Sequence, residues 1–90
     1  MVEFEWDPTK SEATYRIRGF DFAYASRVFS GVWQETVDTR RDYGKVRRQA
    51  IGEVNGDLLV VIYTMRGTKR RLISARRASR KERSEWLSRG

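Results

Sequence analysis

The chain has 90 residues, and its 19 lysine and arginine residues outnumber its 12 aspartate and glutamate residues, which gives a formal net charge of +7. It contains no cysteine and no histidine, so a disulfide framework, a thiolate zinc site, the commonest metal ligand and the usual general base are all excluded. We therefore expect a single domain over residues 1–90 that needs no metal ion or cofactor.

The N-terminal residues predict a pair of short helices. Asp7 followed by Pro8 is typical of a helix N-cap and first helical position, so a helix should run to about Arg18 and end at Gly19. Asp21 can cap a second helix that closes at residue 31. Its apolar stripe would comprise Phe22, Ala25, Val28 and Phe29. Such a helical hairpin must cover an apolar surface.

Four β-strands are predicted to supply that surface, over Val32–Val37, Lys45–Val54, Asp57–Met65 and Arg70–Ala75. Residues 42–44 should form a turn. Asn55 and Gly56 predict a type I′ hairpin, because this turn needs a positive φ at both central positions. Gly67 and Thr68 predict a second, type II′ turn. The fold class is therefore α+β, with two N-terminal helices packed on a four-stranded antiparallel sheet and a C-terminal helix.

The two turns define an expected strand register. The pairs across the first turn are Val54–Asp57, Ile51–Val60, Gln49–Ile62, Arg47–Thr64 and Lys45–Arg66, and those across the second are Met65–Arg70, Thr64–Arg71 and Ile62–Ile73. One face would then hold the helical hairpin on Ile51, Leu58, Val60, Ile62, Ile73 and Ala75, with Arg47, Arg66 and Arg71 clustered at one end. The other face would be an exposed contact surface of Arg48, Tyr63, Arg70, Leu72, Ser74 and Arg76. A slip of one residue would exchange the two roles.

The positive charge is concentrated at the C-terminal end of the chain. From Arg66 onward ten basic residues face two acidic ones, a net +8, whereas residues 1–65 carry nine basic and ten acidic residues, a net −1. Apolar residues at 72, 73 and 75 interrupt the arginines as in a strand, so we expect the guanidinium groups to project from folded backbone toward a phosphate-rich partner. Ser79 and Glu82 have the spacing of a capping box that starts a C-terminal helix running toward Leu87.

An arginine cluster of Arg47, Arg66, Arg71 and Arg76 can bind phosphate and stabilise a pentavalent transition state, but it is a poor general base. If the substrate is RNA, the proton of the 2′-OH must pass to Glu82, to Lys10 with a lowered pKa, or to water in a strongly positive field. Each candidate also has a purely structural interpretation. The arginines can be solvated charges, Glu82 can serve only the capping box, and Tyr63 and Trp86 can be core aromatics.

Taken together, these residues resemble the BrnT family of toxins. The resemblance covers almost the whole chain and is carried by Phe4-Glu5-Trp6-Asp7-Pro8 with Lys10, Gly19, Phe22, Ala25, Val28, Phe29, Asp42-Tyr43-Gly44, Tyr63-Thr64-Met65-Arg66, Arg71-Leu72-Ile73-Ser74-Ala75-Arg76, Glu82 and Arg83. It implies a RelE-like fold and a ribonuclease of a type II toxin-antitoxin system that inhibits translation. It also implies a BrnA-like ribbon-helix-helix antitoxin, with operator DNA bound only through the toxin-antitoxin complex.

By this resemblance the catalytic candidates are Arg66, Arg71, Arg76, Lys10 and Glu82. The RNA-binding candidates are Arg47, Arg48, Tyr63, Arg70 and Arg77. The N-terminus lacks the pattern of a signal peptide, and the longest apolar run, residues 58–63, is too short to span a bilayer. We therefore expect a cytoplasmic protein without a membrane partner.

The chain departs from the family pattern in its first helix. Thr14, Ile17 and Arg18 stand where the family usually has asparagine, lysine and histidine, and Lys45 replaces an acidic residue. The missing imidazole either removes a general acid or base, or matters little because it only caps the helix. Three functions therefore stay open: a ribonuclease toxin, a non-catalytic module that binds nucleic acid or antitoxin, and a structural half of an operon repressor.

Overall fold

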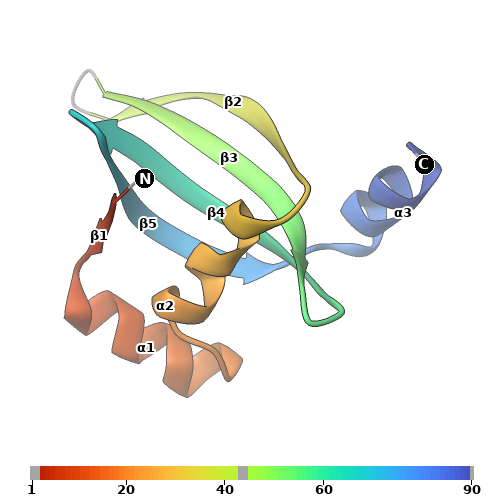
Figure 1. The fold of residues 1–90 in the computed structure, drawn as a ribbon, viewed down its shortest axis with the longest axis horizontal. Helices are drawn as coiled ribbons and strands as arrows, with labels where there is room; N and C mark the ends of the chain where they lie inside the picture. Colours follow the sequence, from red (N-terminus) through yellow and green to blue (C-terminus); the bar gives the residue numbers. More distant parts are fainter. Residues whose placement is uncertain (1–2, 43–44, 90) are drawn as a thin grey trace.

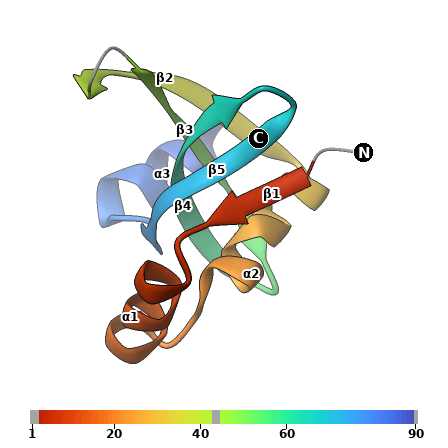
Figure 2. The ribbon, with the colours of Figure 1, turned by 90° about the vertical axis from the view of Figure 1, so that its left-hand side faces the viewer.

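The structure is a computed structural model that describes residues 3–42 and 45–89 (Figure 1). Its elements in chain order are β1 (Glu3–Trp6), α1 (Pro8–Arg18), α2 (Phe22–Ala25), the 3₁₀ helix η1 (Ser26–Ser30), β2 (Trp33–Asp42), β3 (Lys45–Val54), β4 (Asp57–Arg66), β5 (Lys69–Arg77) and α3 (Arg80–Ser88). The turned view separates α2 and α3 onto opposite sides of the twisted sheet (Figure 2). In the described ranges, no helix is long and apolar enough to cross a membrane.

The sheet has five strands in the order β1-β5-β4-β3-β2, with β1 parallel to β5 and the other pairs antiparallel. The predicted α+β class is confirmed, but the prediction of a four-stranded antiparallel sheet is wrong. The missed strand brings Glu3 opposite Lys69 and Glu5 opposite Arg71. The signals for a hairpin lie within a few residues of each other. A parallel pair joins segments far apart in the chain, so no turn signal in the sequence predicts the pairing of β1 with β5.

Both predicted tight turns are present. Asn55 and Gly56 have φ values of 50° and 86°, and Gly67 has a φ of 61°. The observed register confirms the pairs Val54–Asp57, Ile51–Val60, Gln49–Ile62, Met65–Arg70 and Thr64–Arg71. The predicted Ile62–Ile73 pair is wrong, because a β-bulge beside Tyr63 shifts the ladder and places Ile62 opposite Ser74. Leu72 and Ala75 consequently share the main hydrophobic core.

The predicted roles of the two sheet faces are exchanged. The main core lies between the sheet and the α2–η1 segment and comprises Phe20, Phe22, Ala25, Val28, Ala50, Val54, Leu59, Val61, Tyr63, Leu72 and Ala75. Along β4 the four residues 58–61 are all buried, so apolar character alone did not distinguish the faces. Gly52 permits η1 to pack closely on this face, because a Cβ at this position would lie 3.0 Å from Val28 Cγ1 of η1 and 3.1 Å from Trp33 Cβ.

The helix boundaries follow local capping. The Asp7 side chain accepts a hydrogen bond from Thr9 N at 2.9 Å, and Gly19 adopts a left-handed φ of 84° that ends α1. Asp21 caps α2 through Tyr24 N at 2.9 Å. The predicted second helix is an α-helix only over Phe22–Ala25 and continues as η1.

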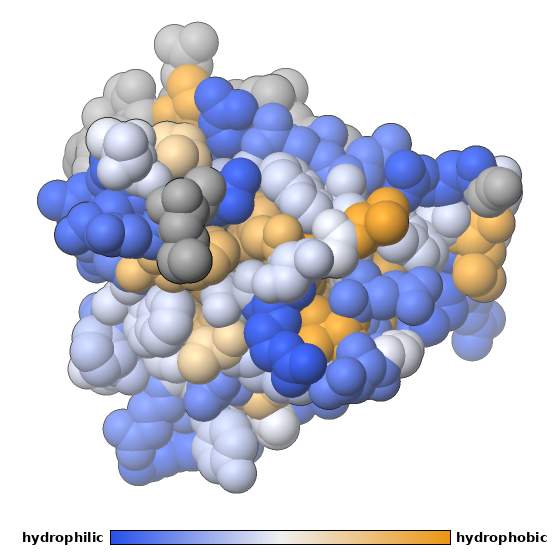
Figure 3. Space-filling view, in the orientation of Figure 1, coloured by the Kyte–Doolittle hydropathy of each residue, from blue (hydrophilic) through white to orange (hydrophobic). Residues whose placement is uncertain are grey.

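Two further predicted boundaries differ at β2. The strand runs to Asp42, well past the predicted end at Val37, so Asp42 belongs to the strand. The other two residues of the predicted turn, 43 and 44, lie outside the described residues. On the side of the molecule seen in Figure 1, hydrophilic residues cover much of the surface, and apolar residues show through in small patches (Figure 3).

Candidate nucleic-acid interface

Four predicted phosphate-binding arginines share the sheet face that α3 covers. Arg71 and Arg76 pair with Thr64 and Val60 of β4, and these two lie on the same face because they are four residues apart. The same alternation places Arg66 on that face. On β3, Arg47 alternates with Gln49 and Ile51, which lie under α3. We call the surface of Arg47, Arg66, Arg71 and Arg76 the arginine face.

A carboxylate from β1 links two of these arginines. Arg71 Nη1 lies 3.3 Å and Arg66 Nη1 3.7 Å from Glu5 Oε2. Arg71 is half-buried, with 34% of its side chain exposed, and Arg66 is exposed. Because one carboxylate neutralises only one of the two cations, this pair keeps a net positive charge and N–H donors toward solvent. Glu5 was not among the predicted site residues, although its alternation with Phe4 and Trp6 indicates that it faces away from the core.

Arg76 is held by Glu82 of α3 in a two-pronged ion pair, with Nη1–Oε1 at 2.7 Å and Nη2–Oε2 at 3.0 Å. Glu82 Oε1 also accepts a hydrogen bond from Ser79 N at 2.8 Å, so the predicted capping box is confirmed. The hydrogen bond from Arg76 is the main cause that lowers the pKa of Glu82 to about 2, and the pKa of Arg76 is raised in return. Both oxygens of this carboxylate thus bind Arg76, and the ion pair fastens α3 to β5.

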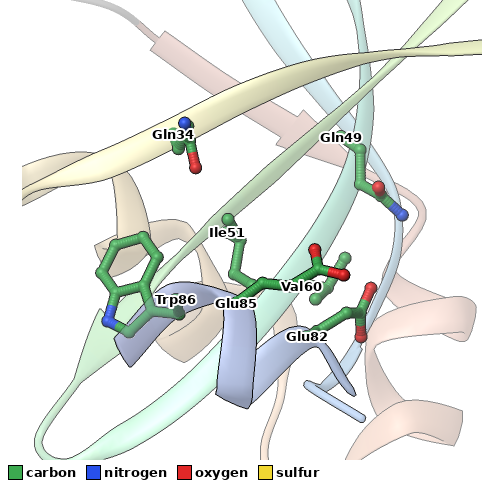
Figure 4. Close-up of a pocket in the computed structure, with 7 residues that line it drawn as sticks. All are labelled: Gln34, Gln49, Ile51, Val60, Glu82, Glu85 and Trp86. Carbon is green, nitrogen blue, oxygen red and sulfur yellow. The ribbon is translucent and has the colours of Figure 1, made fainter. Parts of the chain in front are cut away.

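A groove of about 120 Å³ lies between α3 and the sheet, lined by Gln34, Gln49, Ile51, Val60, Glu82, Glu85 and Trp86 (Figure 4). Trp86 is fixed by a hydrogen bond from its indole nitrogen to Glu53 Oε1 at 2.9 Å. The carboxylates of Glu82 and Glu85 both point from the helix into the groove (Figure 4). The sequence prediction missed Gln34, Gln49 and Glu85. The three-residue spacing of Glu82 and Glu85 was the available signal, since it places both on one helical face.

Tyr63 and Arg48, two predicted RNA-binding residues, lie on the opposite face. Tyr63 is only 1% exposed, and its hydroxyl donates a hydrogen bond to Glu35, which also binds Arg48 at 3.1 Å. Burial, followed by the neighbouring Glu35 carboxylate, raises the pKa of Tyr63 to about 12. The prediction that Tyr63 belongs to an exposed contact surface is therefore wrong, and its ring packs edge-on against Phe29.

Arg70 and Arg77 also belong to that opposite face. The Arg70 guanidinium lies over the rings of Phe29 and Tyr63, with its central carbon 4.4 Å and 5.9 Å from their centroids. Arg77 donates a hydrogen bond to the Arg18 carbonyl at the end of α1 at 2.7 Å and lies over Phe20. Both contacts stabilise the attachment of the N-terminal helices to the sheet.

Lys10 is exposed on α1, and no hydrogen bond or ion pair between described residues joins it to the arginine face. The structure therefore gathers four of the predicted arginines with Glu82 and distributes the remaining candidates elsewhere. No group of three or more acidic residues suited to a metal ion occurs within residues 3–42 and 45–89.

An α+β fold that presents arginines and a helix-covered groove on one sheet face has the electrostatic character of a protein that binds a phosphate polymer. A family model described as "Ribonuclease toxin, BrnT, of type II toxin-antitoxin system" matches residues 6–82. The match covers most of the chain, so the protein belongs to the BrnT family of toxins, as the sequence resemblance predicted. A search of curated proteins gives no match.

Proposed function

We propose that the protein is a metal-independent endoribonuclease that binds RNA on the arginine face. The observation that carries this proposal is the gathering of Arg47, Arg66, Arg71 and Arg76 on one sheet face in a member of a ribonuclease toxin family. Guanidinium groups keep their protons at physiological pH and present several fixed donors, so they bind phosphate strongly.

In the proposed reaction, the 2′-oxygen of a ribose attacks the adjacent phosphorus while the bond from phosphorus to the 5′-oxygen breaks. The products are a 2′,3′-cyclic phosphate and a 5′-hydroxyl. Arg66 and Arg71 bind the phosphate and stabilise the negative charge that develops on its oxygens. Water in the positive field of the arginines accepts the proton of the 2′-OH and returns one to the leaving 5′-oxygen, because both oxygens of Glu82 are already bound by Arg76.

The proposed partner is a BrnA-like ribbon-helix-helix antitoxin. The net charge of +7 is concentrated toward the C-terminal end of the chain and suits an acidic antitoxin segment as well as RNA. Operator DNA would be bound only through the toxin-antitoxin complex. Residues 1–90 would act as one RelE-like toxin domain in the cytoplasm and inhibit translation by cutting RNA there.

An RNA cleavage assay in excess EDTA tests this proposal. Wild type should produce fragments that end in a 2′,3′-cyclic phosphate, and Arg71→Ala should lose about a hundredfold in rate, because one contact to the transition-state charge is worth about 3 kcal/mol. Arg16→Ala is the matched control, since Arg16 is an exposed arginine on α1 paired only with Glu12 in the described structure. Equal rates for wild type and Arg71→Ala would contradict the proposal.

A non-catalytic RNA-binding module is the second candidate, and the position of Glu82 favours it. Arg66 and Arg71 share one carboxylate and keep a net positive charge for phosphate, whereas both oxygens of Glu82, the predicted proton acceptor, are bound by Arg76. RNA that stays intact in the assay but shifts on a low-salt gel would support this candidate and reject cleavage of free RNA.

A further inference from the structure

The groove beneath α3 differs in chemistry from the arginine face beside it. Its lining combines two carboxylates, two carboxamides and the apolar side chains of Ile51 and Val60. Carboxylates repel phosphate, so this groove cannot be one more contact for the RNA backbone. Carboxylate and amide groups around an apolar floor do suit a nucleobase, which has a hydrogen-bonding edge and two apolar faces.

We propose that this groove is a base-specific subsite that takes an unpaired guanine, with Glu85 as the residue that reads it. The inference rests on the proposed RNA binding but goes further, because it names the base that the site selects. It assigns a function to a carboxylate that the proposed cleavage reaction does not use.

Glu85 is the free carboxylate of the groove. Its side chain makes no hydrogen bond or ion pair with any residue in the described part of the chain, and it points into the space between α3 and the sheet (Figure 4). Glu82, by contrast, directs both oxygens at Arg76. A new hydrogen-bond donor that enters the groove therefore meets Glu85 with both of its acceptor oxygens available.

Guanine is the base that matches such a pair of acceptors. Its Watson–Crick edge carries two adjacent donors, N1–H and the N2 amino group, which can bind both oxygens of one carboxylate. Adenine, cytosine and uracil each present at most one donor group on that edge, next to ring nitrogen or carbonyl acceptors that a carboxylate repels. A two-pronged hydrogen bond to a charged group is the geometry that discriminates most strongly.

The aromatic wall of the groove is already positioned for a base. Glu53 holds the Trp86 indole nitrogen at 2.9 Å, and the Arg89 guanidinium lies 4.6 Å from the indole centroid. With its ring so fixed, Trp86 offers contact area to a base without a large loss of side-chain entropy.

The groove also lies within reach of a bound RNA backbone. Glu82 lines the groove and binds Arg76, which is on the same strand and the same face as Arg71. The two arginines pair with residues of β4 that are four positions apart, which corresponds to about 13 Å along the strand. A short single strand whose phosphates follow β5 can therefore turn one base into the space below α3.

Binding of fluorescent hexanucleotides tests the inference without requiring cleavage. The probes would carry 2′-fluoro riboses, which cannot attack the phosphate, and a single variable base in a uridine background. Wild type should bind the guanine probe about tenfold more tightly than the adenine, cytosine or uracil probe. Inosine, which lacks the N2 amino group, should lose most of this advantage, and 7-deazaguanine, which keeps both donors, should retain it.

Two variants complete the test. Glu85→Gln should bind all probes alike, whereas Glu12→Gln, a carboxylate of α1 outside the groove, should keep the guanine preference. A preference that survives in Glu85→Gln, or equal wild-type affinity for all four bases, would overturn the inference. Arg71→Ala distinguishes it from the proposed function, because loss of a phosphate contact should weaken every probe equally. Uniform wild-type binding that Arg71→Ala weakens would reject only the guanine subsite.

Discussion

Replacing Glu82 with glutamine tests the energetic role of the contact between α3 and β5. Glutamine has nearly the same shape as glutamate, and it also fits the third helical position of a capping box. The substitution therefore keeps the bond to Ser79 N and removes the charge that holds Arg76. The difference in stability between wild type and Glu82→Gln consequently reports the ion pair rather than the helix cap.

The expected magnitude follows from the pKa of Glu82, which falls from 4.5 to about 2 on folding. At about 1.36 kcal/mol per pH unit this corresponds to an upper bound of about 3.4 kcal/mol. Since 26% of the Glu82 side chain and 35% of the Arg76 side chain are exposed, solvent screening should reduce the contribution to about 1–2 kcal/mol. The depressed pKa stabilises the folded state above pH 4.5, and this stabilisation is lost as the pH falls toward 2.

Urea unfolding at a series of pH values measures this effect. At pH 7 the free energy of unfolding of Glu82→Gln should be lower than that of wild type by about 1–2 kcal/mol. The difference should shrink to a few tenths of a kcal/mol near pH 2, where about half of the wild-type carboxyl groups are protonated. Glu12→Gln, which removes an exposed i,i+4 ion pair on α1, should change stability by less than about 0.5 kcal/mol. A Glu82→Gln deficit that stays constant from pH 7 to pH 2 would refute the electrostatic reasoning.

Further substitutions test the core and separate structural arginines from binding arginines. Gly52→Ala should lower the free energy of unfolding by about 1–3 kcal/mol, because its Cβ would lie 3.0 Å from Val28 Cγ1, and an unchanged thermal midpoint would contradict this packing. Tyr63→Phe should cost about 1 kcal/mol through the lost hydroxyl bond in urea unfolding, and a neutral result would argue against that bond. Arg77→Ala should lower the thermal midpoint but leave RNA affinity intact. Arg71→Ala should instead leave the thermal midpoint unchanged, weaken RNA affinity and reduce the slope of log K against log salt by about 0.7. Identical behaviour of the two arginine variants would reject the division of the faces.

Short-range signals in the sequence determined where the elements begin and end. Asp7 with Pro8, the Asn55–Gly56 pair and the Ser79–Glu82 spacing each predicted a boundary that the structure confirms. These signals succeed because a cap or a two-residue turn depends on hydrogen bonds and φ angles within three or four residues. The concentration of positive charge near the C-terminal end and the family resemblance were likewise evident from the residues alone.

The candidate site was only partly predictable, because local signals do not show which distant segments a side chain will contact. Sequence named all four arginines as one phosphate-binding cluster. The expected register, however, placed Arg76 on the face opposite Arg71, and this was wrong because the bulge beside Tyr63 brings Arg76 to the same face. Sequence also grouped the four arginines with Tyr63, Arg70 and Arg77, which the structure places against the N-terminal helices. Their residue types suit either role, and the contacts that decide between the roles come from segments far away in the chain.

Only the tertiary structure decided which face of the sheet is covered and which is available. The buried residues at 58–61 make β4 apolar on both sides, and the bulge beside Tyr63 changes the side on which the later residues of β5 lie. The parallel pairing of β1 with β5 brings Glu5 to Arg71 across 66 positions in sequence. Local sequence sets backbone geometry, but the packing of two apolar faces against distant helices is settled by the total contact energy of the folded chain.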